Sequence, residues 1–265
     1  MLVALFTIGI VYLLYCIRRN KTLTYQCFLL TLPTSVNRRT KFIASHDKSV
    51  PLEIIYGVDT KSVENAKKYQ DIVDPVYFKQ ALMMHYNSTH IRPDMTYFNT
   101  GAIGCYMGHM EFYRRCFEQG LKYAVIFEDN VIVTNPKLYD EIQEVIDTVG
   151  GNFEMCFFHC HSRLPYDRLN TPIERVKWIA STKCYLINVE NMQKYYKYFF
   201  PIDNHVDMKH EDIIARGARV FYKELKDCMY IDRSNSTIGH SRHRKPKYFS
   251  RQYPTVTTDV LKYGY

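Results

Sequence analysis

Three oxygen-bearing side chains follow directly on an apolar run near the middle of the chain. Residues Tyr123–Phe127 are uninterrupted apolar residues, and Glu128, Asp129 and Asn130 come next. A short apolar run bounded by polar residues is typical of a buried strand, and in open α/β sheets ligands bind beyond the carboxyl ends of the strands. Oxygen ligands at such a position suit a hard cation such as Mg²⁺ or Mn²⁺. The motif alone is equally consistent with acidic residues that begin a loop and cap the next helix.

The rest of the chain predicts the elements that would position these residues. Apolar runs predict strands and amphipathic spacing predicts helices, and the two types alternate. The predicted strands are 25–32, 53–59, 155–159, 183–188 and 219–222, and the predicted helices are 36–46, 75–85, 101–120 and 135–149. This alternation predicts an α/β fold with a mostly parallel central sheet flanked by helices.

Three segments in order carry a resemblance to a known family. They are Leu29–Arg39, which contains Pro33 and an arginine pair; Gly101–His109, with the sequence GAIGCYMGH; and Ala124–Val131, with the sequence AVIFEDNV. In this order and spacing the chain resembles glycosyltransferase family 25, over roughly residues 25–207. A weaker fourth match is Cys184–Ile187 followed by Pro201–Asp203. The resemblance implies a GT-A-like nucleotide-binding fold.

The resemblance also implies which residues bind the donor, a UDP-sugar. The arginine forks would contact its phosphates, and the start of the helix at Gly101 would present backbone N–H groups. The implied donor-binding residues are Arg38, Arg39, Gly101, Gly104, His109 and Glu128. Each has a plainer alternative: a solvated helix face for the arginines, a tight turn for the glycines, and a structural role for His109.

Metal binding and proton transfer are implied in the same way. Asp129, Asn130 and, by analogy with other GT-A enzymes, His240 would hold Mn²⁺ or Mg²⁺. Asp203 or Asp207 would act as the general base that deprotonates the acceptor hydroxyl.

The implied activity is inverting transfer of galactose or glucose from the UDP-sugar to a hydroxyl of a glycan or protein acceptor. Three departures from the family pattern keep a second hypothesis open. Asn130 stands where the family has aspartate, Ala102 where it has glutamate, and Gly108 where it has serine. The alternative is a catalytically silent relative that binds a nucleotide sugar or a partner protein.

The N-terminus predicts a membrane anchor. Residues 1–17 carry no charge, and Arg18, Arg19 and Lys21 follow. This length lies at the short end of what spans a bilayer, and a cleavable signal would need a basic start and a small-residue cleavage site. We therefore expect a single-pass anchor over 1–21, a transferase domain over 22–240 and a basic, aromatic tail over 241–265. The side of the membrane stays open, because the basic flank favours the cytosol whereas the sequons at Asn87 and Asn235 suit a secretory lumen.

Composition and cysteine spacing argue against two other classes, nucleic-acid-binding proteins and zinc-binding proteins. The net charge of +8 favours anionic partners, but no nucleic-acid-binding motif accompanies it, so no nucleic-acid partner is expected. None of the eight cysteines forms a CxxC pair. Cys156 and Cys160 lie close to His159 and His161, and zinc is conceivable there, but the segment Met155–His159 is better interpreted as a buried strand.

Overall fold

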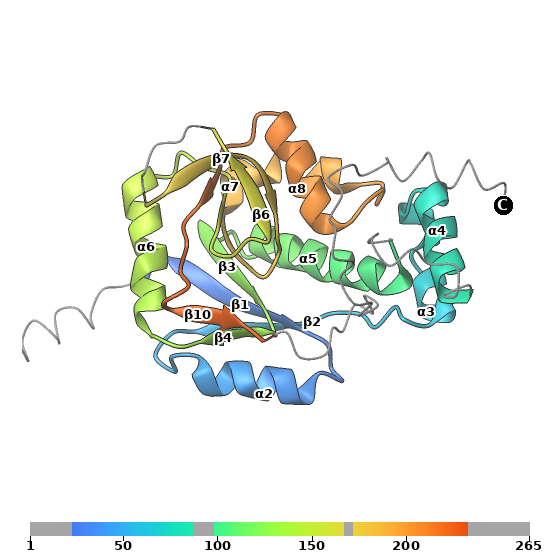
Figure 1. Cartoon of the computed structure of the whole chain (residues 1–265), viewed down its shortest axis with the longest axis horizontal. Helices are drawn as coiled ribbons and strands as arrows, with labels where there is room; N and C mark the ends of the chain where they lie inside the picture. The colour runs from blue at the N-terminus through green and yellow to red at the C-terminus, as the bar shows by residue number, and fades with distance from the viewer. Residues whose placement is uncertain (1–22, 87–97, 167–171, 233–265) are drawn as a thin grey trace, which may run out of the picture.

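The core of the chain is an eight-stranded mixed sheet with helices on both faces (Figure 1). The computed structural model describes residues 23–86, 98–166 and 172–232. The strand order is β2-β1-β3-β8-β5-β9-β7-β6, and β10 and β4 form a separate pair. The strands are β1 (Tyr25–Thr31), β2 (Leu52–Tyr56), β3 (Tyr123–Glu128), β4 (Val131–Val133), β5 (Met155–Phe157), β6 (Ser162–Pro165), β7 (Glu174–Ala180), β8 (Cys184–Asn188), β9 (Val220–Tyr222) and β10 (Met229–Ile231). The predicted α/β class is confirmed.

Helices α2, α4, α5 and α6 lie close to where the sequence pattern predicts them, whereas α3, α7 and α8 are additional. They are α2 (Val36–Ser45), α3 (Val63–Lys67), α4 (Pro75–Tyr86), α5 (Thr100–Glu118), α6 (Lys137–Val149), α7 (Val189–Gln193) and α8 (Val206–Ala215), with 3-10 turns at Gln70–Ile72 and Tyr196–Phe199. Asn135 accepts a hydrogen bond from the Lys137 amide ahead of α6. The hairpin of β6 and β7 and the β4–β10 pair were not predicted, because they are short or largely exposed.

Three strands at one end of the sheet run parallel, and their carboxyl ends therefore meet. β1 pairs in parallel with β2 on one side and with β3 on the other, with Leu30 opposite Ile55 and Glu128. β8 then runs antiparallel to both β3 and β5. As a result the first residues of β8 lie beside the last residues of β3, which places the residue before β8 at the carboxyl end of β3.

Alternation along the strands builds two hydrophobic cores, one on each face. Phe28 and Ile126 belong to the core that includes α5, whereas Leu29 and Phe127 belong to the core on the opposite face. That second core takes buried side chains from α2 and α6, and Figure 1 shows α2 on the side of β1 away from α5. Successive residues of β3 thus point to different environments.

Helix α5 packs closely on the loop after β2 through a glycine. The Thr60 hydroxyl accepts a hydrogen bond from the Gly104 amide at 2.8 Å and donates one to the Thr100 carbonyl at 2.6 Å. This hydroxyl therefore bridges a donor and an acceptor that an α-helix would normally pair directly. A Cβ on Gly104 would lie 2.3 Å from the Val58 carbonyl oxygen, so only glycine fits at this contact.

None of the helices within residues 23–86, 98–166 and 172–232 is both long and apolar enough to cross a membrane. The predicted anchor at 1–21 and the predicted tail at 241–265 lie outside these ranges, and His240 does as well. The boundaries proposed for the three regions therefore stay predictions. Cys156 lies in β5 and is buried, as the strand interpretation of that segment predicts.

Replacing Gly104 with alanine should destabilise the fold by about 1–3 kcal/mol, because the new methyl group must push α5 away from the Val58 backbone. This loss should outweigh the gain of about 1 kcal/mol in helix propensity. Urea unfolding of Gly104→Ala and of Gly57→Ala tests this. At Gly57 a Cβ would make only ordinary contacts of 3.5 Å or longer, and equal stability of the two variants would contradict the packing role.

Candidate active site

A pocket opens at the carboxyl ends of the three parallel strands, against the start of α5. Its walls come from the ends of β1 and β3, from the loop after β2 and from the first turns of α5. The lining residues are Leu30, Thr31, Leu32, Gly57, Val58, Asp59, Thr60, Lys61, Gly101, Gly104, Cys105, Glu128 and Asp129. This is the place where α/β sheets bind ligands, and it contains two of the three polar residues that follow the apolar run.

Glu128 is held by a cation and a hydroxyl. One of its oxygens, Oε2, lies 2.5 Å from Lys183 Nζ, and the other, Oε1, accepts a hydrogen bond from Thr182 Oγ1. Burial raises the pKa of the Glu128 carboxyl, but Lys183 and His109 more than offset this and hold that pKa well below its usual range. Burial also lowers the pKa of Lys183, and Glu128 raises it above its ordinary value. The two groups therefore form a charged, buried pair.

Asp129 is held by a different pair of groups. Its Oδ2 accepts a 2.7 Å hydrogen bond from Thr31 Oγ1, and its Oδ1 lies 3.2 Å from Arg38 Nε. Burial raises the pKa of Asp129, and Arg38 and Thr31 offset this only in part. A carboxylate whose charge is incompletely compensated would gain from a further positive group in the pocket.

The two carboxylates diverge because they are consecutive residues at the end of a strand. Side chains of neighbouring strand residues point to opposite faces of the sheet. Glu128 accordingly lies on the α5 side with His109, and Asp129 lies on the α2 side with Arg38. The next residue, Asn130, is buried, and its side-chain oxygen has no hydrogen-bond partner within the described ranges.

The predicted Mn²⁺ or Mg²⁺ set is incomplete as the described residues are arranged. The Asn130 side-chain oxygen is an acceptor that a hard cation could use, but both oxygens of Asp129 are already engaged. A cation at Asp129 would have to replace the Arg38 contact. Because the third predicted ligand lies outside the described residues, this metal site stays a prediction.

The predicted donor-binding residues differ in their access to the pocket. Gly101 borders it, whereas the Gly104 amide is bonded to Thr60 rather than directed to a ligand. The Arg39 guanidinium donates to the carbonyls of Leu32 and Pro33 and lies over the Tyr56 ring. Arg39 thus stabilises the turn after β1, and Arg38 is the arginine beside the pocket carboxylate.

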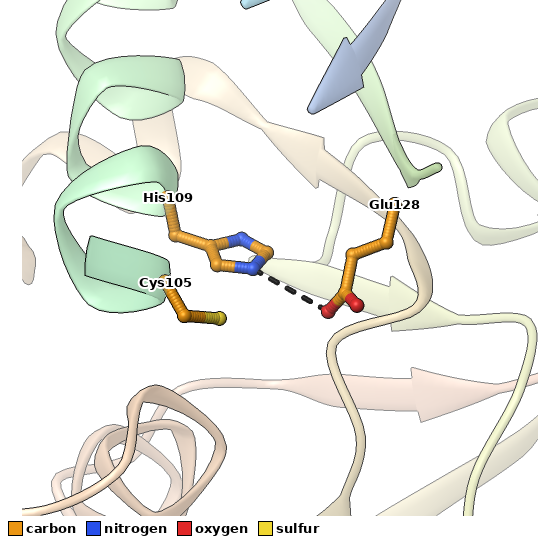
Figure 2. Close-up of side chains that lie close together, drawn as sticks. All are labelled: Cys105, His109 and Glu128. Atoms are coloured by element: carbon orange, nitrogen blue, oxygen red, sulfur yellow. Dashed lines mark ion pairs between the residues drawn. The ribbon is translucent and has the colours of Figure 1, made fainter. Parts of the chain in front are cut away.

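His109 is fully buried behind the pocket wall. Its Nδ1 lies 2.8 Å from the Tyr185 hydroxyl, and its ring stacks on the Tyr185 ring. Its Nε2 lies 3.7 Å from Glu128 Oε1 (Figure 2). The histidine therefore acts on the pocket through Glu128.

The two candidate bases also differ in their surroundings. Asp203 is ion-paired with Lys209 at 2.7 Å, and Lys209 also contacts Asp212. Asp207 lies in the first turn of α8 and makes no ion pair with any residue that the structure describes. Burial, then Glu128 and Asp207, raise the pKa of the Cys105 thiol.

Two residues central to this site were missed by sequence reasoning. Lys183 was predicted only as the start of a strand, and Cys105 only as part of the family motif. The Glu128 amide donates to the Lys183 carbonyl at 2.8 Å, which shows how the antiparallel β3–β8 pairing brings the lysine to the carboxylate. No local pattern around Lys183 encodes that pairing.

The fold and the pocket define an α/β protein with a ligand site at the ends of its parallel strands. A family model described as glycosyltransferase family 25 (LPS biosynthesis protein) matches residues 25–210, and the chain belongs to this family. The match supports glycosyl transfer as the general activity. No curated protein matched the chain.

Several solved structures show distant similarity to this chain. UDP-glucose pyrophosphorylase complexed with UDP-glucose matches at 8% identity and a TM-score of 0.42, covering 78% of this chain and 92% of that one. The apo form of mouse xyloside xylosyltransferase 1 matches at 8% identity and a TM-score of 0.35, with coverage of 66% and 71%. A197 from STIV matches at 9% and 0.38, with coverage of 76% and 82%. Scores of this size do not establish a shared fold.

Removing the ammonium from Glu128 should be strongly destabilising at neutral pH. In Lys183→Met the buried carboxylate loses its cation, and we expect a loss of about 3–5 kcal/mol at pH 7. Burial should then raise the Glu128 pKa. Because the wild-type pKa is depressed, the pair's contribution is present above the carboxyl's ordinary value and is lost only as pH falls through the folded-state pKa. In the variant the raised pKa lets Glu128 take up a proton as pH falls, so the deficit should shrink between pH 7 and about 4, and shrink further below that as the wild-type pair is lost.

Urea unfolding between neutral and acidic pH measures this deficit. Lys41→Met is the matched control, since Lys41 pairs with Asp232 at 3.0 Å but is 59% exposed, and its loss should be about 0–1 kcal/mol. If Lys183→Met lost no more than this control, Glu128 would not depend on Lys183.

Proposed function

We propose that this chain transfers galactose or glucose from a UDP-sugar to a hydroxyl of a glycan or protein acceptor, with inversion at the anomeric carbon. The observation that carries the proposal is the pocket at the ends of β1, β2 and β3, which two carboxylate–cation pairs and the first turns of α5 surround. Family membership supports glycosyl transfer. The geometry supports a ligand with a negatively charged centre and several hydroxyl groups.

A diphosphate would meet two kinds of donors here. Arg38 lies beside the pocket, and its guanidinium can exchange Asp129 for phosphate oxygens with bidentate geometry. Lys61 and the start of α5 border the same space, and amides at a helix N-terminus favour anions. Asp129 and Asp59 are acceptors for the hydroxyls of ribose or hexose.

The chemical step would be one displacement. The acceptor oxygen bonds to the anomeric carbon while the bond from that carbon to the diphosphate oxygen breaks, and UDP leaves with the bonding electrons. The acceptor proton passes to a carboxylate. Of the two predicted bases, Asp207 is better suited than Asp203, because Lys209 neutralises Asp203.

A catalytically silent relative is the second candidate. Each pocket carboxylate is already paired with a cation, and Asn130 lacks the charge of the family's aspartate. Such a protein would bind a nucleotide sugar without transferring the sugar.

We also propose attachment to a membrane through residues 1–21, on the uncharged run and the basic residues that follow it.

Release of UDP from a panel of UDP-sugars tests the main proposal. We expect one donor to be hydrolysed or transferred selectively, with at least tenfold lower release by Asp129→Asn, which keeps the size of the side chain but removes its charge. Asp71→Asn, on an exposed turn, is the matched control. Parallel assays with Mn²⁺, with Mg²⁺ and with a chelator measure the metal requirement. If the protein neither released UDP nor bound it, the proposal would be contradicted. Binding without release in the presence of acceptors would favour the silent relative.

The assignment of the base predicts a difference between two similar variants. Asp207→Asn should lower kcat by about 10²–10⁴-fold, as expected when a general base is lost, with little change in UDP affinity. Asp203→Asn should reduce kcat much less, because this residue is held by Lys209. Steady-state kinetics and UDP titration measure both. A larger loss in Asp203→Asn would assign the base to Asp203.

A further inference from the structure

Three side chains of different chemistry converge at the inner wall of the pocket. Cys105 and His109 lie one turn apart on α5, and Glu128 lies at the end of β3 (Figure 2). One ligand atom from each, the sulfur, an imidazole nitrogen and a carboxylate oxygen, lie within 4.8 Å of one another. It is the one group of at least three His, Cys, Asp or Glu residues with this geometry within residues 23–86, 98–166 and 172–232.

The separation of the nitrogen and oxygen ligands is close to that in a tetrahedral metal site. Ligands at zinc–nitrogen, zinc–oxygen and zinc–sulfur bond lengths lie about 3.3–3.6 Å apart in a tetrahedron. His109 Nε2 and Glu128 Oε1 are 3.7 Å apart, so this pair needs almost no movement. The sulfur lies within 4.8 Å of both of these side chains, and Cys105 is only partly buried, on the wall of the pocket.

The imidazole is oriented as it is in metal sites. His109 Nδ1 is bonded to the Tyr185 hydroxyl, and a metal-binding histidine uses its second nitrogen in this way to fix ring and tautomer. The other nitrogen, Nε2, is fully buried and points towards Glu128, whose Oε1 lies 3.7 Å away, beyond hydrogen-bond distance. A buried polar atom without a hydrogen bond is costly, and a metal ion between the two atoms would bind both.

The carboxylate can take part without losing its existing cation. Lys183 binds Oε2, whereas the oxygen nearest to His109 is Oε1. Oε1 also accepts from Thr182 and retains a second lone-pair direction for a metal. Lys183 would then remain as a neighbouring positive charge that fixes the carboxylate.

We propose that Cys105, His109 and Glu128 bind one Zn²⁺ ion, with the fourth coordination position open to the pocket. Three protein ligands and an open position are typical of zinc sites that take part in binding or catalysis. Cys105 and Glu128 border the pocket, whereas His109 lies behind them. The open position therefore faces the space where a phosphate or hydroxyl oxygen of a ligand would lie.

The sulfur distinguishes this ion from Mn²⁺ and Mg²⁺. A thiolate selects zinc or cobalt, whereas magnesium and manganese prefer oxygen ligands. A cysteine thiol carries its proton at neutral pH and must lose it to bind zinc as a thiolate. Binding therefore releases that proton to solvent as the sulfur–hydrogen bond is replaced by a sulfur–zinc bond.

Metal binding by the untagged, full-length chain tests the proposal independently of transfer activity. Zinc is added to chelator-treated protein in competition with a chromophoric chelator, and bound metal is counted by elemental analysis. We expect one zinc per chain, proton release on binding, and at least a tenfold weaker affinity in Cys105→Ser and in His109→Gln. Cys160→Ser, a partly buried cysteine outside the cluster, should bind as the wild type does.

Cobalt substitution in the unaltered protein keeps the test valid if a variant fails to fold. We expect a thiolate-to-cobalt charge-transfer band and the visible spectrum of four-coordinate Co²⁺, both removed by zinc and not by Mg²⁺. Failure to bind zinc near one equivalent, absence of the thiolate band, or unchanged affinity in a folded Cys105→Ser variant would overturn the site. None of these outcomes bears on whether the chain transfers a sugar.

Discussion

The buried pair of Glu128 and Lys183 is the interaction around which the pocket is organised. A carboxylate at the end of a buried strand is costly unless a cation and hydrogen bonds compensate its charge. Lys183 and Thr182 supply both from the start of β8. They can do so because β8 runs antiparallel to β3, so its first residues lie beside the last residues of β3. The charge state of the pocket thus depends on the direction of one strand.

The alternation of strand side chains divides the acidic pair between two surroundings. Glu128 belongs to a cluster with α5, and Asp129 to a cluster with the turn after β1 and with α2. Both carboxylates still border the same pocket. This division gives each carboxylate its own positive partner, Lys183 for Glu128 and Arg38 for Asp129. A diphosphate near Arg38 and the proposed Zn²⁺ ion near Cys105 would therefore not compete for the same oxygen atoms.

Close approach of α5 to the sheet makes this arrangement possible. Gly104 allows the helix to contact the loop after β2, and Gly108 lies against Leu30, where a Cβ would come within 2.7 Å of a Leu30 methyl carbon. Cys105 and His109 are each one residue beyond these glycines. The two small residues therefore set how near the thiol and the imidazole come to Glu128. Gly108, a departure from the family pattern, thus has a packing role in this chain.

Local sequence determined the elements and the edge of the sheet that carries the pocket. The apolar run before Glu128, the helical spacing from Gly101 and the resemblance over the three motifs correctly predicted β3, α5 and the family. These features are local, because hydrophobic periodicity and capping act over a few residues. The partners of each charged group were decided only by the tertiary structure. Lys183 reaches Glu128 through a strand pairing 55 residues apart in sequence, and Thr31 reaches Asp129 across 98 residues. No short pattern encodes such contacts, since they depend on strand order and direction, which the packing of the whole sheet sets.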